Sequence, residues 1–449
     1  MATWKQVLTK MVFNAEQRMD ELRYRMKYSL GGLGPIHIVP YRGYGNANRL
    51  YLRGRVLEDK GIPEAESNDS LWENLLYMYQ RIESDEVPHA RLMARFQDIE
   101  QEITCDQEGF FEVIVEPSEP LVPDRLWHSI ELELLDPIPD EQRNHPVKAT
   151  GEVLVPPPTA KFAVISDIDD TVLQADVANL FKVARHVFLD NAHTRLPFPG
   201  VAALYRALFH GKTGNEMNPL FYVSSSPWNL YDLLSQFFNL QDIPIGPVLF
   251  LRNWGVSEKE ILPVRNREYK LATIRQMVDF FPELPFILIG DSSQEDPEIY
   301  TEIVDQYPER IKAVYIRNVT RNLKRPEDIQ KLAERVVEAG SALVLADDSL
   351  SIAKHAVEQG FIPWEALPSI GESKQKDEAP PSPIEKLLGE EAPVETPTVR
   401  VSEEEAQNGE IEETIKETGK EATKKPPTVI AEGEEARETG KERKKKPPA

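Results

Sequence analysis

The chain has 449 residues and a formal net charge of −23, with 75 acidic against 52 basic side chains. This acidity argues against non-specific nucleic-acid binding, because like charges repel the phosphate backbone. The single cysteine, Cys105, excludes an intrachain disulfide framework and a cysteine-rich zinc site. With 41% hydrophobic residues but no signal-peptide pattern and no apolar run of about 18 residues, we expect a cytoplasmic protein of two or three domains.

Residues 1–30 are predicted to form an amphipathic helix. Apolar side chains recur at steps of three and four between Trp4 and Met26, which is the period of an α-helix. The opposite face is rich in Lys and Arg, with Asp and Glu interspersed. A basic amphipathic helix can lie on an anionic membrane surface, but the same pattern suits a helix that packs on its own domain or on another protomer. Peripheral membrane contact is therefore one hypothesis for this segment.

Residues 31–158 are predicted to form a β-rich, sandwich-like accessory domain. Apolar residues alternate with polar ones or run in short blocks, and turn residues separate the blocks. We expect a turn at 43–46, a hairpin turn at 106–109 and a helical insertion at 70–82. The predicted strands are 36–40, 50–57, 91–96, 102–105, 110–115 and 129–135.

This accessory domain shows no group of nucleophilic or metal-binding side chains in its sequence. Tyr41, Arg42 and Tyr44 could contact a ligand, although aromatic residues near turns also serve packing. We therefore expect the domain to act as a scaffold or to recognise a protein partner.

The next predicted strand leads directly into a group of acids. Residues 162–165 form a short apolar run, rich in β-branched residues, after three prolines at 156–158, which predicts a buried strand of a parallel sheet. Asp167, Asp169 and Asp170 come at its carboxyl end. Ligands of open α/β sheets bind at that end of the strands, so these acids are candidates for a site.

Closely spaced carboxylates suit phosphoryl chemistry. Like charges raise one another's pKa, and a bound Mg²⁺, which prefers oxygen ligands, removes that cost. One carboxylate can then attack phosphorus, while a second, two residues further on, transfers protons. Thr171 can satisfy backbone groups as the chain turns. The alternative is an acidic surface turn or a helix cap, and the later motifs argue against it.

Two further apolar runs end in polar residues. Residues 219–224 end at Ser224, which Ser225 follows, and Ser226 with Pro227 has the pattern of an N-cap and a first helical position. Ser224 would then lie beside a helix N-terminus suited to an anion.

The last part of the pattern combines a cation with two acids. Lys270 lies near the start of a helical pattern. A predicted buried strand at 285–290 is followed by Asp291 and Asp296.

The ordered set of motifs resembles the four motifs of the haloacid dehalogenase superfamily of phosphohydrolases. The longer strings at 166–172, 222–228 and 290–300 are similar to the catalytic domain of actin-patch-protein-type phosphatidate phosphatases, and the resemblance covers about residues 160–325. For 159–371 it implies an α/β fold, with a Rossmann-like parallel sheet of the haloacid dehalogenase type and a minimal cap.

The resemblance also implies roles for individual residues. Asp167 would be the nucleophile, Asp169 the general acid and then base, and Asp296 would orient Lys270 or metal-bound water. The implied catalytic residues are Asp167, Asp169, Ser224 and Lys270; the implied phosphate-binding residues are Thr171, Ser224, Ser225 and Lys270; the implied Mg²⁺ ligands are Asp167, Asp169 through its backbone carbonyl, Asp291 and Asp296.

The implied function is a Mg²⁺-dependent phosphomonoesterase that converts phosphatidate to diacylglycerol and phosphate through an aspartyl-phosphate. The intervals 172–218 and 225–269 leave no room for a large lid domain, so we expect a large substrate such as a lipid headgroup. Trp228 and Trp254 could enter a membrane interface or pack internally. The alternatives are a phosphatase for a phosphoprotein or a soluble ester, and a non-catalytic scaffold.

The C-terminal part is predicted to complete the sheet and then to lose its fold. We expect strands at 311–319 and 341–345, a helix at 325–340 and a last helix at 352–359 that starts from Asp347 and Asp348, with His355 packed or exposed rather than catalytic. Residues 372–449 have the Glu-, Lys- and Pro-rich composition of disorder. The basic cluster at 443–446 could contact anionic lipid or simply be solvated, and the tail could bind a protein partner.

Overall fold

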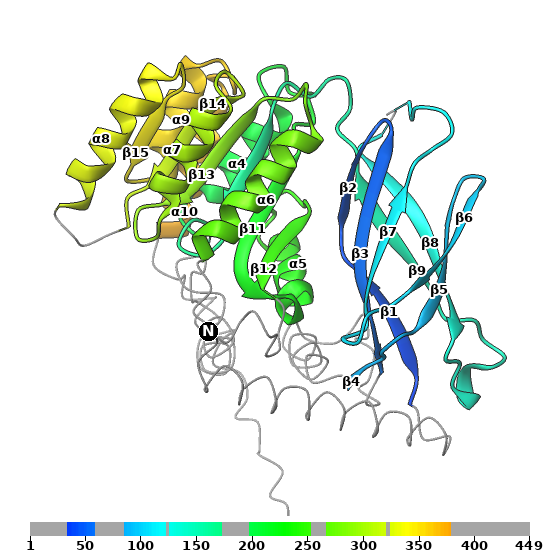
Figure 1. Cartoon of the computed structure of the whole chain (residues 1–449). Coiled ribbons are helices and arrows are strands. Elements are labelled where there is room, and N and C mark those ends of the chain that lie inside the picture. The colour runs from blue at the N-terminus through cyan, green and yellow to red at the C-terminus, as the bar shows by residue number, and fades with distance from the viewer. Residues whose placement is uncertain are drawn as a thin grey trace, which may run out of the picture. The chain divides into compact units, whose positions relative to one another are not determined.

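The computed structural model describes residues 34–58, 85–122, 125–172, 197–252, 266–319 and 324–378. A nine-stranded, mainly antiparallel sheet precedes a six-stranded parallel sheet with helices (Figure 1). The predictions for 1–30 and 70–82, for Trp254 and for the tail after residue 378 lie outside the described residues. Among the described helices, none combines the length and apolar character that a bilayer-spanning helix requires.

The accessory region forms one continuous sheet rather than the two separate sheets of a sandwich. Its order is β1-β3-β2-β9-β8-β5-β6, with β4 and β7 also paired to β3. Among the described strands of this sheet, only β2 and β9 pair in parallel. Inward side chains of β1, β3, β5, β7 and β8 form a single core, so the sheet curls around one interior. The strands are β1 Ile36–Pro40, β2 Gly43–Asn46, β3 Arg49–Glu58, β4 Asp85–Glu86, β5 Arg91–Phe96, β6 Ile99–Thr104, β7 Phe110–Val115, β8 Trp127–Asp136 and β9 Lys148–Leu154, with a 3-10 helix at Asp140–Gln142.

The prediction of a turn at 43–46 was wrong, because these residues form strand β2. The glycines serve close strand packing instead. A Cβ on Gly43 would lie 2.1 Å from the Tyr51 carbonyl oxygen, and one on Gly45 would lie 2.4 Å from a methyl carbon of Leu50. The actual turn lies after β2, where the Asn46 side chain accepts hydrogen bonds from the backbone amides of Asn48 and Arg49.

The turn at 106–109 exists, but it does not join a hairpin. The Gly109 amide donates to the Asp106 carbonyl oxygen, as the turn prediction requires. Strand β6, however, pairs with β5, and β7 pairs with β3. The turn therefore carries the chain across the curled sheet, and the hairpin prediction was wrong because a turn pattern does not specify the strand partner.

The second region has six parallel strands in the order β12-β11-β10-β13-β14-β15. The chain runs outward from β10 in one direction and then outward from β13 in the other, so the order reverses between these two strands. Such a reversal is where open α/β sheets bind ligands, beyond the carboxyl ends of the strands. The strands are β10 Ala163–Asp167, β11 Leu220–Pro227, β12 Val248–Arg252, β13 Phe286–Asp291, β14 Ile311–Arg317 and β15 Leu343–Ala346, which confirms the predicted buried strands.

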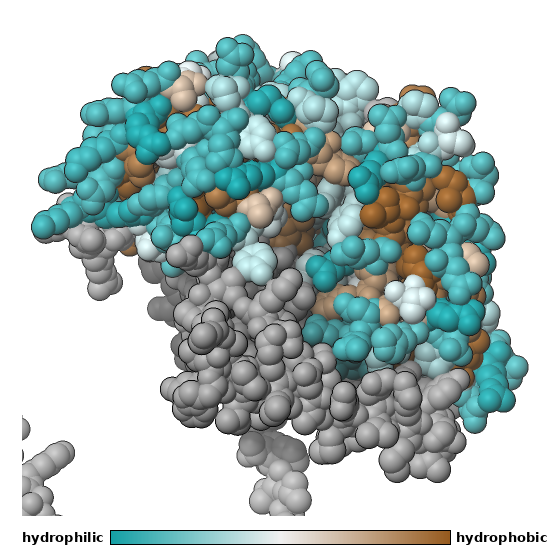
Figure 2. Space-filling model, viewed as in Figure 1, coloured by the Kyte–Doolittle hydropathy of each residue, from teal (hydrophilic) through white to brown (hydrophobic). Residues whose placement is uncertain are grey.

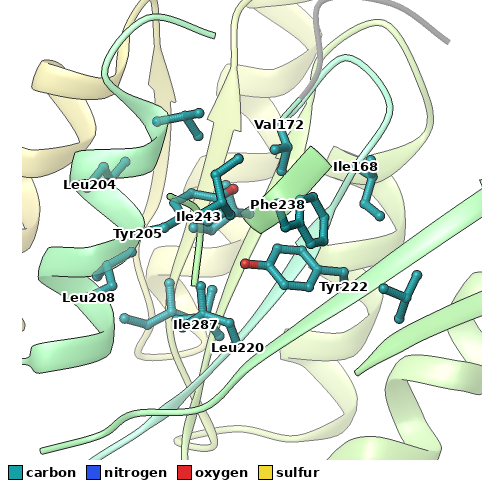
Figure 3. Packing of buried hydrophobic residues seen from close by; sticks show 14 of the residues in the cluster. Ile168, Val172, Leu204, Tyr205, Leu208, Leu220, Tyr222, Phe238, Ile243 and Ile287 are labelled. Atoms are coloured by element: carbon teal, nitrogen blue, oxygen red, sulfur yellow. The ribbon is translucent and has the colours of Figure 1, made fainter. Parts of the chain in front are cut away.

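Helices cover both faces of this sheet. One core joins the sheet to α4, α5, α9 and α10 and includes Tyr205, Tyr222 and Phe238 (Figure 3). A second core joins the other face to α6, α7 and α8. The helices are α4 Val201–His210, α5 Tyr231–Leu240, α6 Asn266–Phe280, α7 Asp296–Gln306, α8 Arg325–Glu338, α9 Ser349–Glu358 and α10 Ala366–Glu378, with a 3-10 turn at Trp228–Leu230.

Two predicted boundaries need correction. Ser226 is not a helix N-cap, because strand β11 continues to Pro227 and helix α5 begins only at Tyr231. Strand β11 continues past Ser224 through a register shift against β12, a place where a strand tolerates proline. The disordered tail was predicted to start at residue 372, but α10 continues to Glu378 because buried Ile370 anchors it in the core.

Aromatic residues of the first sheet pack against the second region, and the described residues belong to one compact unit. Tyr41 stacks on Trp228 with ring centroids 4.7 Å apart, and Tyr44 meets Phe280 edge-on at 5.0 Å. The backbone amide of Arg42 donates to the Tyr231 hydroxyl at 2.7 Å. Tyr41, Tyr44 and Trp228 are buried, so packing is their role in this structure.

Candidate active site

The acids of the sequence motifs meet at the point where the strand order reverses. Asp167 is the last residue of β10, Asp291 is the last residue of the adjacent β13, and Asp296 is the first residue of α7. Carboxylate oxygens of these three residues lie within 4.8 Å of one another, and all three side chains are buried.

Lys270 provides a positive charge inside this cluster. Its Nζ donates to Asp167 Oδ1 at 2.6 Å and also to Asp296 Oδ1. Burial lowers the pKa of Lys270, but the two carboxylates outweigh burial and raise it above the ordinary value. The lysine is therefore held as a cation between the two acids.

The cluster has more negative than positive charge. Burial raises the pKa of Asp167, Lys270 lowers it in part, and Asp296, Asp169 and Asp291 raise it further, so the net shift is upward. Burial likewise raises the pKa of Asp296, against the effect of Lys270. One lysine does not neutralise three buried acids, and a divalent cation would supply the missing charge.

Two carboxylate oxygens fit a role as ligands of such a cation. Asp291 Oδ1 accepts hydrogen bonds from the Ser293 amide at 2.6 Å, the Ser293 hydroxyl at 2.5 Å and the Gln294 amide at 3.1 Å. Asp291 Oδ2 and Asp167 Oδ2 are buried and have no hydrogen-bond partner in the described part of the chain. Buried acceptors are normally satisfied, so these two oxygens fit a hard cation such as Mg²⁺.

Asp296 has less free capacity than the other two acids. Its Oδ1 accepts from Lys270, and its Oδ2 accepts from the Asp291 amide at 3.2 Å. Gly290 allows this position, because a Cβ at residue 290 would lie 2.3 Å from Asp296 Oδ2. Asp296 therefore orients Lys270 and the end of β13 more directly than it offers an oxygen to a metal.

The turn after β10 brings Asp169 towards the Asp291 loop. Asp169 is buried, and its carbonyl oxygen accepts a hydrogen bond from Gln294 Nε2 at 3.3 Å. Asp170 has a left-handed backbone with φ of 57°, which aspartate tolerates better than most residues. Thr171 Oγ1 is buried without a hydrogen-bond partner among the described residues, and its carbonyl accepts from Arg317.

The serines lie on the neighbouring strand. Val223 of β11 is the register partner of Asp167, and buried Ser224 follows it directly. Ser225 also belongs to β11, but its side chain is outside the described residues. The structure thus brings Asp167, Lys270, Asp291 and Asp296 together and places Ser224 next in line on the adjacent strand.

Sequence reasoning assigned no role to several residues that support the site. Ser166 Oγ donates to the Asp167 carbonyl oxygen at 2.7 Å and lies 2.7 Å from the buried Tyr205 hydroxyl. Arg325 donates to the Gln294 carbonyl oxygen in the loop after Asp291, and the Gln294 side chain donates to the Asp169 carbonyl oxygen. Gln294 lay within the recognised motif string, whereas Arg325 follows Asp291 at a distance in sequence that no motif spans.

Residues 162–318 match the family model of the phosphatidate phosphatase APP1 catalytic domain. The phosphatidate phosphatase APP1 of Saccharomyces cerevisiae is 30% identical over 218 residues, which cover 47% of this chain and 36% of the yeast protein. These similarities identify the segment as an APP1-type catalytic domain and confirm the resemblance that the motifs gave.

A second relative is an uncharacterised protein of Schizosaccharomyces pombe. It is 34% identical over 162 residues, which cover 35% of this chain and 25% of that protein. The chain thus spans about a third or less of the length of the curated relatives it matches. A solved carbohydrate acetylesterase from Xanthomonas citri gives a TM-score of 0.25 at 8% identity, covering 74% of this chain and 71% of that one, a similarity too low to support an argument.

Proposed function

We propose that this chain is a Mg²⁺-dependent phosphomonoesterase that hydrolyses phosphatidate to diacylglycerol and phosphate. The observation that supports this best is the cluster of three buried acids around Lys270, with two unpartnered carboxylate oxygens, within a segment that matches a phosphatidate phosphatase catalytic domain. We also propose the haloacid dehalogenase type of fold with a minimal cap, which the reversed parallel strand order supports.

In this proposal Asp167, Asp291 and the backbone carbonyl of Asp169 hold Mg²⁺, with Asp296 beside them. The bound ion would supply positive charge that keeps Asp167 and Asp291 ionised and offsets the negative charge of the phosphoryl group. Side chains of this chain carry out the bond-making, bond-breaking and proton-transfer steps.

The first step forms a covalent intermediate. A carboxylate oxygen of Asp167 attacks the phosphorus atom, and the bond between phosphorus and the ester oxygen breaks. Asp169 gives its proton to the departing alkoxide, which leaves as the alcohol, diacylglycerol in the case of phosphatidate. Asp167 now carries the phosphoryl group, and Asp169 is ionised.

The second step returns the enzyme to its starting state. Asp169 takes a proton from a water molecule whose oxygen attacks phosphorus, and the bond between phosphorus and the Asp167 oxygen breaks. Inorganic phosphate leaves, and Asp169 is again protonated. Lys270 and Ser224 hold the phosphoryl oxygens during both steps, so this chemistry rests mainly on positioning and charge stabilisation.

The test is phosphate release from phosphatidate in mixed micelles, with and without Mg²⁺, beside a panel of soluble phosphate esters and a phosphopeptide. Mg²⁺-dependent release from phosphatidate that disappears in Asp167→Asn supports the proposal. Release from soluble esters or the phosphopeptide alone keeps the enzyme class but overturns the lipid substrate. No release from any substrate, with the protein folded, overturns the phosphatase function.

A further inference from the structure

The Arg325 side chain of helix α8 holds the loop that connects Asp291 to Asp296. Arg325, the first residue of α8, donates from Nε to the Ser292 carbonyl oxygen at 3.0 Å and from Nη2 to the Gln294 carbonyl oxygen at 2.7 Å. Its Nη2 also donates to Glu298 Oε2 at 2.8 Å, and its Nη1 to the other oxygen of Glu298. The guanidinium group therefore joins both ends of the loop between Asp291 and α7.

This loop determines how the Asp291 carboxylate is presented. The amides of Ser293 and Gln294 bind Asp291 Oδ1, and this leaves Oδ2 without a hydrogen-bond partner in the described residues. Arg325 holds the carbonyl groups of the same short stretch from its other side. A shift of the 292–294 backbone would therefore move the carboxylate oxygen that is available to a cation.

The same loop connects the two acidic motifs. The Gln294 backbone carbonyl binds Arg325, while its side chain donates to the Asp169 carbonyl oxygen. Arg325 is thus connected to Asp291 through the loop backbone. It is also connected to the turn at Asp169 through Gln294.

The geometry of these contacts requires arginine. A planar guanidinium group donates in several fixed directions, whereas a lysine ammonium lacks the fork that binds a carboxylate through two parallel hydrogen bonds. The Arg325 side chain is only 18% exposed. By contrast, Glu327, Asp328 and Lys331 of the same helix are exposed, on a mainly hydrophilic surface (Figure 2).

We propose that Arg325 is a positioning residue of the metal site, which fixes the 292–294 backbone so that Asp291 presents one free oxygen to the cation. This inference rests on the proposed Mg²⁺-dependent function. Arg325 is not proposed to touch the substrate or the metal.

The experiment compares Arg325→Lys, Arg325→Gln and Glu298→Gln with the matched control Arg335→Gln. Arg335 lies on the same helix and pairs with Asp305 in an exposed position. Three quantities are measured in the full chain: the increase in Tm on adding Mg²⁺, the Mg²⁺ concentration for half-maximal phosphate release, and hydrogen exchange of the peptide covering 291–298.

Both Arg325 variants should raise the half-maximal Mg²⁺ concentration by about tenfold or more, as loss of an outer partner of a metal ligand usually does. They should also weaken the Mg²⁺-induced rise in Tm and speed exchange at 291–298. Glu298→Gln should do so less, because the bonds of Arg325 to the loop carbonyls remain. The control should match the wild type in all three quantities.

A lower Tm with an unchanged Mg²⁺ midpoint and unchanged exchange in both Arg325 variants would overturn the inference and leave Arg325 as a structural residue. If Arg325→Gln does not fold, Arg325→Lys decides. Wild-type protein that gains neither Tm nor activity from Mg²⁺ would overturn the proposed function itself, whatever the variants do.

Discussion

Two ion pairs, one from each sheet region, lie in opposite environments. On the nine-stranded sheet, Arg91 pairs with Glu102 at 2.8 Å, and both side chains are about half exposed. At the end of the parallel sheet, Asp167 and Lys270 pair at 2.6 Å with side chains only 4% and 6% exposed. Water and salt screen the first pair, so it stabilises the fold little. The Asp167–Lys270 pair has lost its contact with water, which costs free energy. Buried charged groups of this kind are concentrated at functional sites.

The largest effect is expected at Asp167, the buried acid that we propose as the nucleophile. Asp167→Asn should lower phosphate release by about ten-thousand-fold or more, because an amide does not form the phosphoryl intermediate. Tm should be unchanged or higher, since the substitution keeps the shape and removes one carboxylate from a crowded cluster. Release assays and thermal unfolding check both parts. A variant that keeps a substantial part of the activity would remove the covalent mechanism.

A smaller effect is expected from a methyl group that disturbs the buried cluster. Gly290→Ala places a Cβ 2.3 Å from Asp296 Oδ2, so Asp296 must move from Lys270 and from the Asp291 amide. Activity should fall by about tenfold to a hundredfold, with a weaker Mg²⁺-induced rise in Tm.

Gly371→Ala is the matched control for this change, because its Cβ would meet nothing within 4 Å. It should keep full activity and be neutral or slightly stabilising, since it lies within helix α10. Equal activity of the two variants would show that the position of Asp296 does not matter for turnover.

An intermediate case is the half-buried Asp348, which caps helix α9 and also accepts a hydrogen bond from Lys374 of α10. Burial raises its pKa, but hydrogen bonds from Lys374 and Ser351 outweigh burial and lower the pKa to about 2. The folded-state pKa of Asp348 lies below the unfolded value of about 3.9. The ionised carboxylate therefore adds its full amount to the free energy of unfolding above that pH, and this stabilisation is lost as the pH falls towards 2.

Asp348→Ala should therefore lower the free energy of unfolding by about 1 kcal/mol at pH 7, as loss of an N-cap usually does. The difference from wild type should narrow below about pH 4. Urea unfolding at a series of pH values measures this, with Asp348→Asn as the variant that keeps the cap but loses the charge. A difference that stays constant down to pH 3 would contradict the assignment.

The smallest effect is expected on the exposed pair. Arg91→Gln should change the free energy of unfolding by less than about 0.5 kcal/mol and leave phosphate release unchanged, because the pair is exposed to water. Denaturant unfolding in low and high salt checks this. A loss of activity in this variant would mean that the nine-stranded sheet acts on the site, and the contrast between the two sheets would fail.

The sequence by itself determined the buried strands β10 and β13, the acids at their ends and a helix start at Asp347 and Asp348, where the structure places the Asp348 cap of α9. These features are local: an apolar run, a carboxylate at a strand end, or a side chain that reaches an amide three residues on. The family resemblance rests on the same short strings, and its ordered motifs contain Asp167, Lys270, Asp291 and Asp296.

Only the tertiary structure decided which segments meet. The pairing of β2 with β9, the crossing at 106–109 and the continuation of β11 depend on partners distant in sequence, and local patterns carry no information about them. The same holds for Arg325, which lies at the start of helix α8 and contacts the loop after Asp291. Packing and hydrogen-bond geometry select such partners from the whole chain, so spacing in the sequence does not reveal them.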